Sequence, residues 1–333
     1  MPHTMRGRPV KKVHGLRPKD LERLLESELQ QSHLRVRGSL IGGMANINLL
    51  VFSGSDTFIL KLPGLKGLDT NPFEYEFSIC STMVRDSLCP QPLVTGFLPD
   101  DLGTPFIVYR YEVGTVHSDL QSMSPQDLVL LAEAIQKLRQ QRPPDVRAYS
   151  KPSEYIEGWY RKIQTALNLS ESESPAIPSM FHAIEELRGS LETFVDTTMF
   201  WSGSLMHGDL RPSNIVFQER RALLLDWSEC SYGESLLDIA YLLSEPKDEW
   251  TGQVPMTDSE TTRMRVDALK TLSLMSAVAW TTERLIRIES GQVENNLAGP
   301  QLTKAMSSYL QIKTEMLKQR ISMHIIDTKD ESS

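Results

Sequence analysis

The pattern of apolar and polar residues changes from strand-like to helical along the chain. In the first third, short runs rich in β-branched and apolar residues alternate with polar or glycine-containing turns, which predicts an antiparallel sheet. The sequence also predicts a helix over about Pro72–Arg85, before the last two of these runs. The predicted strands are His33–Ile41, Ile47–Phe52, Thr57–Leu62, Leu93–Phe97 and Pro105–Tyr111.

From Pro125 onward, apolar residues recur at three- and four-residue spacing, beginning with Leu128, Leu131 and Ile135, and this spacing predicts helices. The segment Leu169–Pro178 is interpreted as a loop, and the polar tail Asp327–Ser333 as frayed. The further helices that we predict are Ser153–Leu167, Ser179–Val195, Leu236–Leu243, Thr257–Ile288 and Gln301–Ile321.

These elements indicate an α+β fold with a small, antiparallel β-rich N-lobe and a larger, mostly helical C-lobe. We expect a tail and helix over residues 1–30, the N-lobe over 31–112 and the C-lobe over 113–333. Two units of unlike class that meet near Tyr111–Gly114 would leave a natural cleft for a ligand.

Composition narrows the choice of partners. The chain has 333 residues, with 35 basic and 43 acidic side chains and a formal charge of -8. A general nucleic-acid binder would show a basic excess, so we interpret the basic N-terminal segment as a solvated tail rather than a nucleic-acid arm. The most apolar stretch, Leu269–Trp280, is too short to cross a membrane. The three cysteines show no zinc-site spacing. We expect a cytoplasmic protein, a monomer or homodimer, with no nucleic-acid or membrane partner.

The strongest chemical signal is a polar run that a hairpin follows. The run His207–Asn214 reads HGDLRPSN, and the apolar segments Ile215–Phe217 and Ala222–Leu225 flank a charged turn. Because a hairpin brings its two ends together, Asn214 before it and Asp226 after it are expected to meet.

That arrangement suits phosphoryl transfer from ATP. An amide oxygen and a carboxylate, here Asn214 and Asp226, would hold Mg²⁺ on the phosphates, while a carboxylate five residues before the amide, Asp209, would orient the acceptor hydroxyl. The spacing from Asp209 to Asn214 matches the catalytic loop of kinases. Arg211, two residues after Asp209, could neutralise the transferring phosphoryl group or be exposed to solvent.

At this point the sequence resembles the aminoglycoside phosphotransferase and choline kinase family, which has a protein-kinase-like fold of two lobes. The family pattern is HGDxxxxN, a hairpin, an apolar strand that ends in Asp-Trp or Asp-Phe, a glycine, and Asp-Ile-Ala; here the later parts are Asp226, Gly233 and Asp238–Ala240. The resemblance implies that Asp209 is the catalytic base and that Asn214 and Asp226 bind Mg²⁺. It further implies that His207 braces the loop, unless it only packs, and that Asp238 ties the loop to the next helix.

The resemblance also places the nucleotide site in the β-rich lobe. Lys61 lies in a strand whose other residues fit a buried position, and burying a lysine costs free energy unless it is paired. The resemblance implies that Lys61 contacts the ATP phosphates and pairs with a glutamate of the next helix. With Asn71 as N-cap and Pro72 in the first turn, Glu76 falls beside the apolar stripe of that helix, whereas Glu74 points away. We therefore favour Glu76 and leave Glu74 as the alternative.

Two further segments complete the expected nucleotide site. Gly42, Gly43 and Asn46 occupy the place of the glycine-containing phosphate loop of the family, although a glycine pair alone equally fits a plain turn. The residues Tyr109 and Tyr111 would offer backbone groups to the purine, which leaves the choice between ATP and GTP open.

The acceptor is less defined than the donor. Only 11 residues separate Asp226 from Asp238, too few for the segment with which protein kinases bind peptides, so a small acceptor is favoured over a protein. Acidic residues around Glu229 and Glu234, with Trp227 and Trp250, would suit an amine-bearing acceptor or form a solvated face. A catalytically inactive nucleotide-binding module and an atypical protein kinase are the alternative functions.

Overall fold

The computed structural model describes residues 10–40, 45–66, 68, 70–168, 185, 201–244, 259–294 and 300–330, with side chains as far as residue 322. It contains two compact units. The first comprises Met1–Gly114, Leu223–Ser228 and Gly291–Gly299, and the second comprises Thr115–Ala222, Glu229–Ser290 and Pro300–Ser333. The predicted loop Leu169–Pro178, the pair Gly42 and Gly43 and, apart from residue 185, the predicted helix Ser179–Val195 lie outside the described residues.

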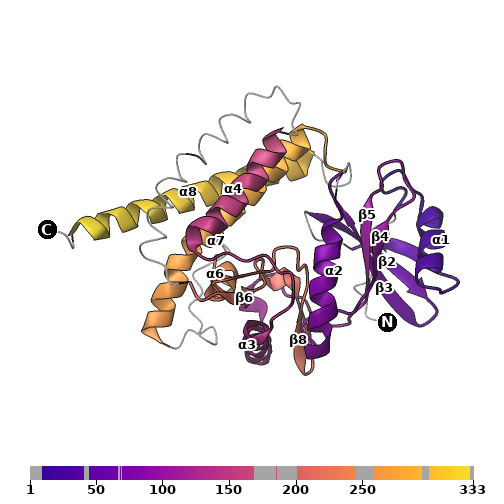
Figure 1. Cartoon of the computed structure of the whole chain (residues 1–333), viewed down its shortest axis with the longest axis horizontal. Helices are drawn as coiled ribbons and strands as arrows, with labels where there is room; N and C mark the ends of the chain where they lie inside the picture. Colours follow the sequence, from indigo (N-terminus) through magenta and orange to yellow (C-terminus); the bar gives the residue numbers. More distant parts are fainter. Residues whose placement is uncertain are drawn as a thin grey trace. The chain divides into compact units, whose positions relative to one another are not determined.

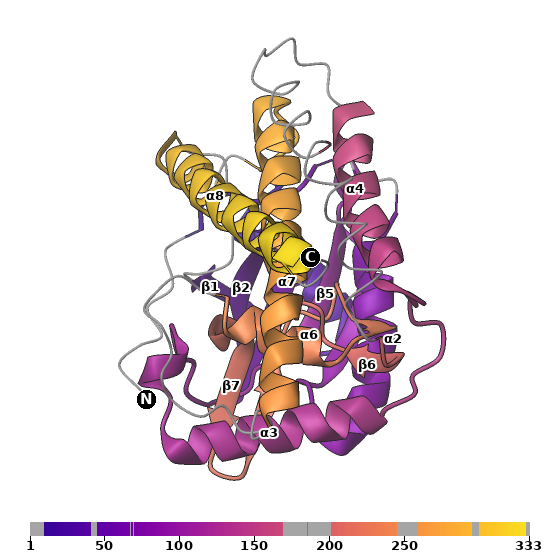
Figure 2. The ribbon, with the colours of Figure 1, turned by 90° about the vertical axis from the view of Figure 1, so that its left-hand side faces the viewer.

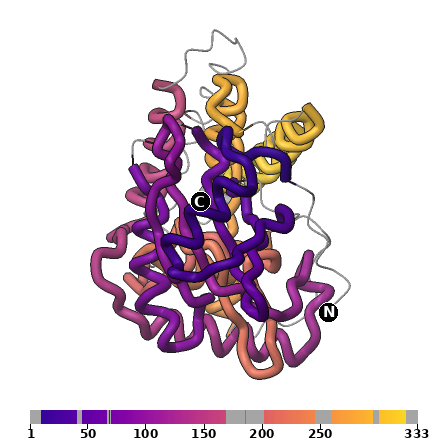
Figure 3. Tube along the Cα trace, turned by 90° about the vertical axis from the view of Figure 1, so that its right-hand side faces the viewer, coloured from indigo at the N-terminus to yellow at the C-terminus, as the bar shows by residue number. Residues whose placement is uncertain are grey.

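The first unit is built on a five-stranded antiparallel sheet, whose strands pass back and forth in Figure 3. The five predicted strands are confirmed, with ends that differ by a few residues. In spatial order they are β1 (Arg35–Ser39), β2 (Asn46–Ser53), β3 (Asp56–Pro63), β5 (Pro105–Arg110) and β4 (Pro92–Phe97).

Two helices cover this sheet on opposite sides, α1 (Pro18–Glu28) and α2 (Pro72–Met83) (Figure 1). Helix α2 begins as the sequence predicts, because the Asn71 side chain accepts a hydrogen bond from the Phe73 N–H at 2.9 Å and Pro72 needs no hydrogen-bond acceptor. A single 3₁₀ turn, η1 (Val84–Asp86), continues α2.

The alternation of side chains along β3 decides which residue faces which helix. Leu60 and Leu62 belong to the apolar core that includes Leu21 and Leu25 of α1. Because successive side chains of a strand point to opposite faces, Lys61 lies on the other face, the one that α2 covers. A buried lysine is thereby directed toward the acidic side chains of α2.

The second unit is mostly helical, as predicted. Its long helix α7 packs against α4, α6 and α8, and Figure 2 shows α4 running beside α7 while α8 crosses it. The helices and 3₁₀ turns are η2 (Leu120–Ser122), α3 (Pro125–Gln140), α4 (Pro152–Asn168), η3 (Pro212–Asn214), α6 (Leu236–Leu242), α7 (Glu260–Glu289) and α8 (Pro300–Asp330). The predicted buried stretch Leu269–Trp280 lies within α7. In the part of the chain that the structure describes, no helix is both long and apolar enough to cross a membrane.

Short strands complete the molecule. The predicted hairpin is present as β7 (Ile215–Gln218) paired with β8 (Arg221–Leu224). A second pair, β6 (Ser204–Met206) with β9 (Ser231–Gly233), was not predicted, because three residues are too few to show an alternating pattern.

The frayed tail predicted for Asp327–Ser333 is wrong in part, since α8 continues to Asp330. Polarity alone does not end a helix. The last residues of α8 include neither glycine nor proline, which are the usual helix breakers.

Candidate active site

The loop after β6 holds the predicted catalytic residues, and a buried carboxylate fixes its start. Asp238, in the first turn of α6, accepts hydrogen bonds from the backbone N–H groups of His207 at 2.8 Å and Gly208 at 2.9 Å. Burial raises the pKa of Asp238, and the nearby His207 and these two N–H groups act in the opposite direction. Asp238 thus ties the loop to the following helix, as the sequence predicts.

Gly208 is required in this loop for two reasons. Its φ of 82° lies in the left-handed region that side-chain-bearing residues rarely adopt. A Cβ at this position would lie 2.3 Å from the backbone oxygen of Glu229. The backbone of Glu229 therefore packs directly against the residue that precedes Asp209.

Replacing Gly208 with alanine is expected to damage both stability and turnover. A left-handed conformation costs an L-residue roughly 1–2 kcal/mol, and the contact with Glu229 must add to that cost because it involves backbone. A shift of about 1 Å at Asp209 would lower turnover roughly 10²-fold. Unfolding by urea and steady-state turnover measure the two effects.

The matched control is Gly203→Ala. Gly203 has a φ of 66°, but a Cβ there would meet nothing within 4 Å. This variant should lose only the free energy that the left-handed backbone costs an L-residue, and it should keep its turnover. Equal losses in both variants would show that the contact between Gly208 and Glu229 has no role.

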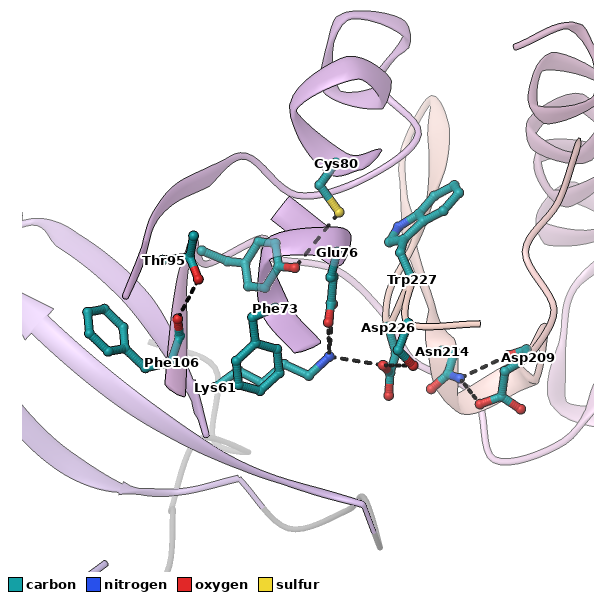
Figure 4. Close-up of polar contacts among 12 residues, drawn as sticks. Lys61, Phe73, Glu76, Cys80, Thr95, Phe106, Asp209, Asn214, Asp226 and Trp227 are labelled. Carbon is teal, nitrogen blue, oxygen red and sulfur yellow. Dashed lines mark hydrogen bonds and ion pairs between the residues drawn. The ribbon is translucent and has the colours of Figure 1, made fainter. Parts of the chain in front are cut away.

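Asp209 is held by two neighbours from its own loop. The Arg211 Nε donates to one carboxylate oxygen at 2.7 Å. The Asn214 amide donates to the other at 3.1 Å and to the Asp209 carbonyl at 3.0 Å (Figure 4). Arg211 thus contacts the predicted base itself, and its contact with the transferring phosphoryl group stays a prediction. A positive charge on a carboxylate stabilises the ionised form, the form in which a base can accept a proton.

His207 is fully buried behind this loop. Its Nδ1 accepts a hydrogen bond from the Asp209 N–H at 3.3 Å, which assigns the ring proton to the other nitrogen for that contact. A buried ring bonded to the backbone supports the loop rather than reacting with a ligand. The bracing role expected for His207 fits this geometry.

Lys61 lies between two carboxylates in the first unit. Its ammonium group donates to the two oxygens of Glu76 at 2.8 and 2.7 Å and to Asp226 at 2.9 Å (Figure 4). Lys61 is only 5% exposed and Glu76 only 1%, whereas Glu74 is exposed. The choice of Glu76 over Glu74 as the partner of Lys61 is thereby confirmed.

The charge of Lys61 depends on these partners. Burial by itself would lower the pKa of Lys61, but the carboxylates of Asp226 and Glu76 outweigh burial and raise it. The lysine therefore stays protonated at physiological pH. A protonated, positioned lysine is what contact with ATP phosphates requires.

Asp226 adopts a strained backbone at the end of the hairpin. Its φ of 64° is uncommon for a residue other than glycine, and its carboxylate accepts from Lys61 and from the Ser228 hydroxyl at 3.3 Å. Trp227 beside it is buried and donates its indole N–H to the Leu224 carbonyl at 2.9 Å. Conformations of this kind persist where function requires them, so the strain itself marks Asp226 as a functional candidate.

The predicted metal ligands have suitable chemistry. Mg²⁺ prefers oxygen donors, and Asp226 offers a carboxylate. The amide nitrogen of Asn214 is engaged by Asp209, so the Asn214 carbonyl oxygen, the atom a metal would use, is turned away from that contact. Among the described residues there is no group of three or more His, Cys, Asp or Glu arranged to hold a metal. Asp226 belongs to the first unit and Asn214 to the second, so their sharing of one ion stays a prediction.

The remaining predicted nucleotide contacts are less direct. The Tyr111 N–H donates to the Thr57 carbonyl at 2.9 Å, which leaves the Tyr111 carbonyl as the backbone group for a purine. Tyr109 lies buried in β5 with its hydroxyl 3.8 Å from the Cys80 sulfur. The burial of Tyr109 raises its pKa. Asn46 opens β2 opposite Pro63, and Gly42 and Gly43 lie outside the described residues. The nucleotide contacts expected for Asn46, Tyr109 and Tyr111 therefore stay predictions.

The acidic and aromatic surface expected for an amine-bearing acceptor is not present in the described residues. Glu229 is bound by Lys162 and Arg147, and Glu234 is buried and bound by Arg265 at 3.2 Å. Trp227 is buried. The other residues expected at that surface, Glu245, Asp248, Glu249 and Trp250, lie outside the described residues. Sequence reasoning missed the cations, since they precede Glu229 by 67 and 82 residues and leave no local pattern.

The two units together define a class. An antiparallel sheet with a buried, carboxylate-paired lysine, followed by a helical unit with an HGDxxxxN loop, is the design of kinase-like phosphotransferases. The sequence model of the phosphotransferase enzyme family matches residues 40–265, more than half of the chain, and the protein belongs to that family.

Solved structures share the fold. Choline kinase LicA from Streptococcus pneumoniae matches with a TM-score of 0.59 and 19% identity, over 90% of this chain and 98% of that one. Spectinomycin phosphotransferase APH(9)-Ia, solved with ADP and spectinomycin, matches with a TM-score of 0.58 and 14% identity, over 90% and 99%.

One curated relative is a much longer protein than this chain. Mouse acyl-CoA dehydrogenase family member 10 is 30% identical over 179 residues, which are 50% of this chain. The match spans only 16% of the length of that mouse protein.

Proposed function

We propose that this protein transfers the γ-phosphoryl group of ATP to a hydroxyl group of a small acceptor. The observation that carries the proposal is the buried Lys61, protonated between Glu76 and Asp226. The three N–H donors of its ammonium group contact Glu76 twice and Asp226 once, so contact with a phosphate oxygen would replace one of these hydrogen bonds.

In this mechanism Lys61 binds the ATP phosphates and Asp209 orients the acceptor. The acceptor oxygen forms a bond to the γ-phosphorus as the bond from that phosphorus to the ADP oxygen breaks, and Asp209 accepts the hydroxyl proton. Arg211 and Asn214 hold the Asp209 carboxylate in orientation, and His207 supports the loop from behind. Mg²⁺, for which Asn214 and Asp226 are the proposed ligands, would neutralise charge on the phosphates.

An assay of ADP formation tests the proposal. Purified protein with ATP should form ADP only when both magnesium and a hydroxyl-bearing acceptor are present, with the label of [γ-³²P]ATP appearing on the acceptor. MgATP at about 100 times its dissociation constant should also add about 2.7 kcal/mol to the free energy of unfolding. A protein that binds MgATP but transfers label to no small molecule, or only to a protein, would contradict it.

A further inference from the structure

A tight turn near the N-terminus directs a histidine into the first unit. Val13 and Leu16 exchange two backbone hydrogen bonds, at 3.0 and 2.9 Å, around the pair His14 and Gly15. Both central residues have a positive φ, 46° and 79°, which is the conformation of a type I′ turn. Such a φ is uncommon for a residue other than glycine. The turn leaves the His14 side chain only 1% exposed, so the backbone fixes the ring in the interior.

Hydrogen bonding assigns the tautomer of the neutral His14 ring. Its Nε2 lies 2.9 Å from the Pro63 carbonyl oxygen, and because a carbonyl oxygen only accepts, Nε2 carries the proton. The other ring nitrogen, Nδ1, is then an acceptor. Nδ1 is buried and has no hydrogen-bond partner among the residues that the structure describes. A buried polar atom without a partner costs free energy, so the neutral ring is not fully satisfied in this position.

The unsatisfied nitrogen faces a carboxylate. The Glu294 Oε2 atom lies 3.9 Å from Nδ1, and the Glu294 side chain is mostly buried. Two acceptors gain nothing from this approach, whereas a proton on Nδ1 would turn them into an ion pair. Lys66 is the other charged group recorded beside this carboxylate, with its ammonium 3.9 Å from the same oxygen. That distance is longer than a hydrogen bond, so Lys66 leaves the oxygen able to accept from His14.

Glu294 belongs to the connector between the two longest helices, α7 and α8. Its N–H donates to the Gly64 carbonyl at 2.8 Å, and the Lys66 N–H donates to the Gln292 carbonyl at 2.9 Å. These bonds attach the connector to the chain that follows β3. The connector Gly291–Gly299 is part of the first unit, whereas α7 and α8 belong to the second. A side-chain ion pair added beside two backbone hydrogen bonds would measurably strengthen this attachment.

We propose that His14 is a pH-sensitive clasp, which fastens the connector to the end of β3 when its ring is protonated. The added proton gives the buried Nδ1 a partner in Glu294, while Nε2 keeps its hydrogen bond to Pro63, so the ring need not move. Histidine is the side chain that ordinarily changes charge between pH 5 and 8. Because the attached connector favours the protonated ring, acid strengthens the attachment and a rise in pH loosens it. The clasp is independent of phosphoryl transfer.

Amide hydrogen exchange measures the clasp directly. The N–H groups of Glu294 and Lys66 exchange when the connector detaches locally. In the full chain without nucleotide, their protection, corrected for the intrinsic exchange rate, should be roughly tenfold higher at about pH 5 than at about pH 8. Nitrogen NMR of the His14 ring should show the Nε2–H tautomer at the higher pH and the protonated ring at the lower. Equal protection at both pH values, or a ring that stays neutral in acid, would overturn the inference.

Variants show which groups cause the pH dependence. Glu294→Gln should abolish it, because the amide carries no charge, and His14→Gln should leave protection low at both pH values. The control is His117→Gln, since His117 also faces a carboxylate, that of Asp127 at 3.2 Å, but in the second unit. This control should keep the full pH dependence at Glu294. A dependence that persists in Glu294→Gln would assign it to another group, and this variant decides the test by itself if His14→Gln does not fold.

Discussion

Replacing Asp209 with asparagine should lower turnover by about 10²–10⁴-fold, the usual effect of removing a general base. Asparagine keeps the shape of the side chain but cannot accept the acceptor proton at neutral pH. Binding of MgATP should be nearly unchanged, because the proposed phosphate-binding lysine belongs to the other unit. Single-turnover rates and titration with a fluorescent ATP analogue separate the two quantities.

The control for this variant is Asp267→Asn. Asp267 forms the same kind of ion pair, with Arg320 at 2.8 Å, on helix α7 of the same unit. This variant loses an ion pair without loss of a base, so its turnover should equal that of the wild type. Near-full activity of Asp209→Asn would show that another group takes the proton.

Replacing Lys61 with methionine should destabilise the protein by about 3–5 kcal/mol, because it leaves the buried Glu76 carboxylate without its cation. MgATP should then no longer raise the melting temperature. Since the pKa of Lys61 is raised above its ordinary value of 10.5, the stabilising effect of its charge is complete below that pH and is lost only as the pH rises through the higher value. Urea unfolding near pH 7 therefore measures it in full.

The control for Lys61→Met is Lys313→Met. Lys313 is also a buried lysine, but its ammonium donates to the Ser244 carbonyl in the second unit. This variant should lose stability and still respond to MgATP. If Lys61→Met kept its response to MgATP, the nucleotide role of Lys61 would be wrong whatever its stability.

The choice of Glu76 as the partner of Lys61 is an example of what the local sequence pattern could predict. Asn71 and Pro72 mark the start of the helix, and helical periodicity then places Glu76 on its buried side and Glu74 on its exposed side. Strand alternation turns Lys61 to the same face. Helical periodicity therefore chose Glu76 over Glu74, whereas the pairing itself, across 15 positions, was implied by the resemblance to the family.

Other features of the site could not be inferred in this way. The contact of the Arg211 guanidinium with Asp209 was not predicted. Neither was the hydrogen bond from the Tyr111 N–H to the Thr57 carbonyl, more than 50 residues earlier. Each outcome depends on which of several nearby acceptors is closest in space, and sequence spacing does not rank them.

The sequence by itself determined the strand and helix pattern, the order of the catalytic motifs and the choice of Glu76 over Glu74, because turn, cap and periodicity rules act between near neighbours. Only the tertiary structure decided that Leu223–Ser228 joins the first unit, that Asp226 is held with a positive φ, and that Glu229 is bound by two cations. Those facts arise from contacts between distant segments, whose free energy depends on packing and burial rather than on any local sequence pattern.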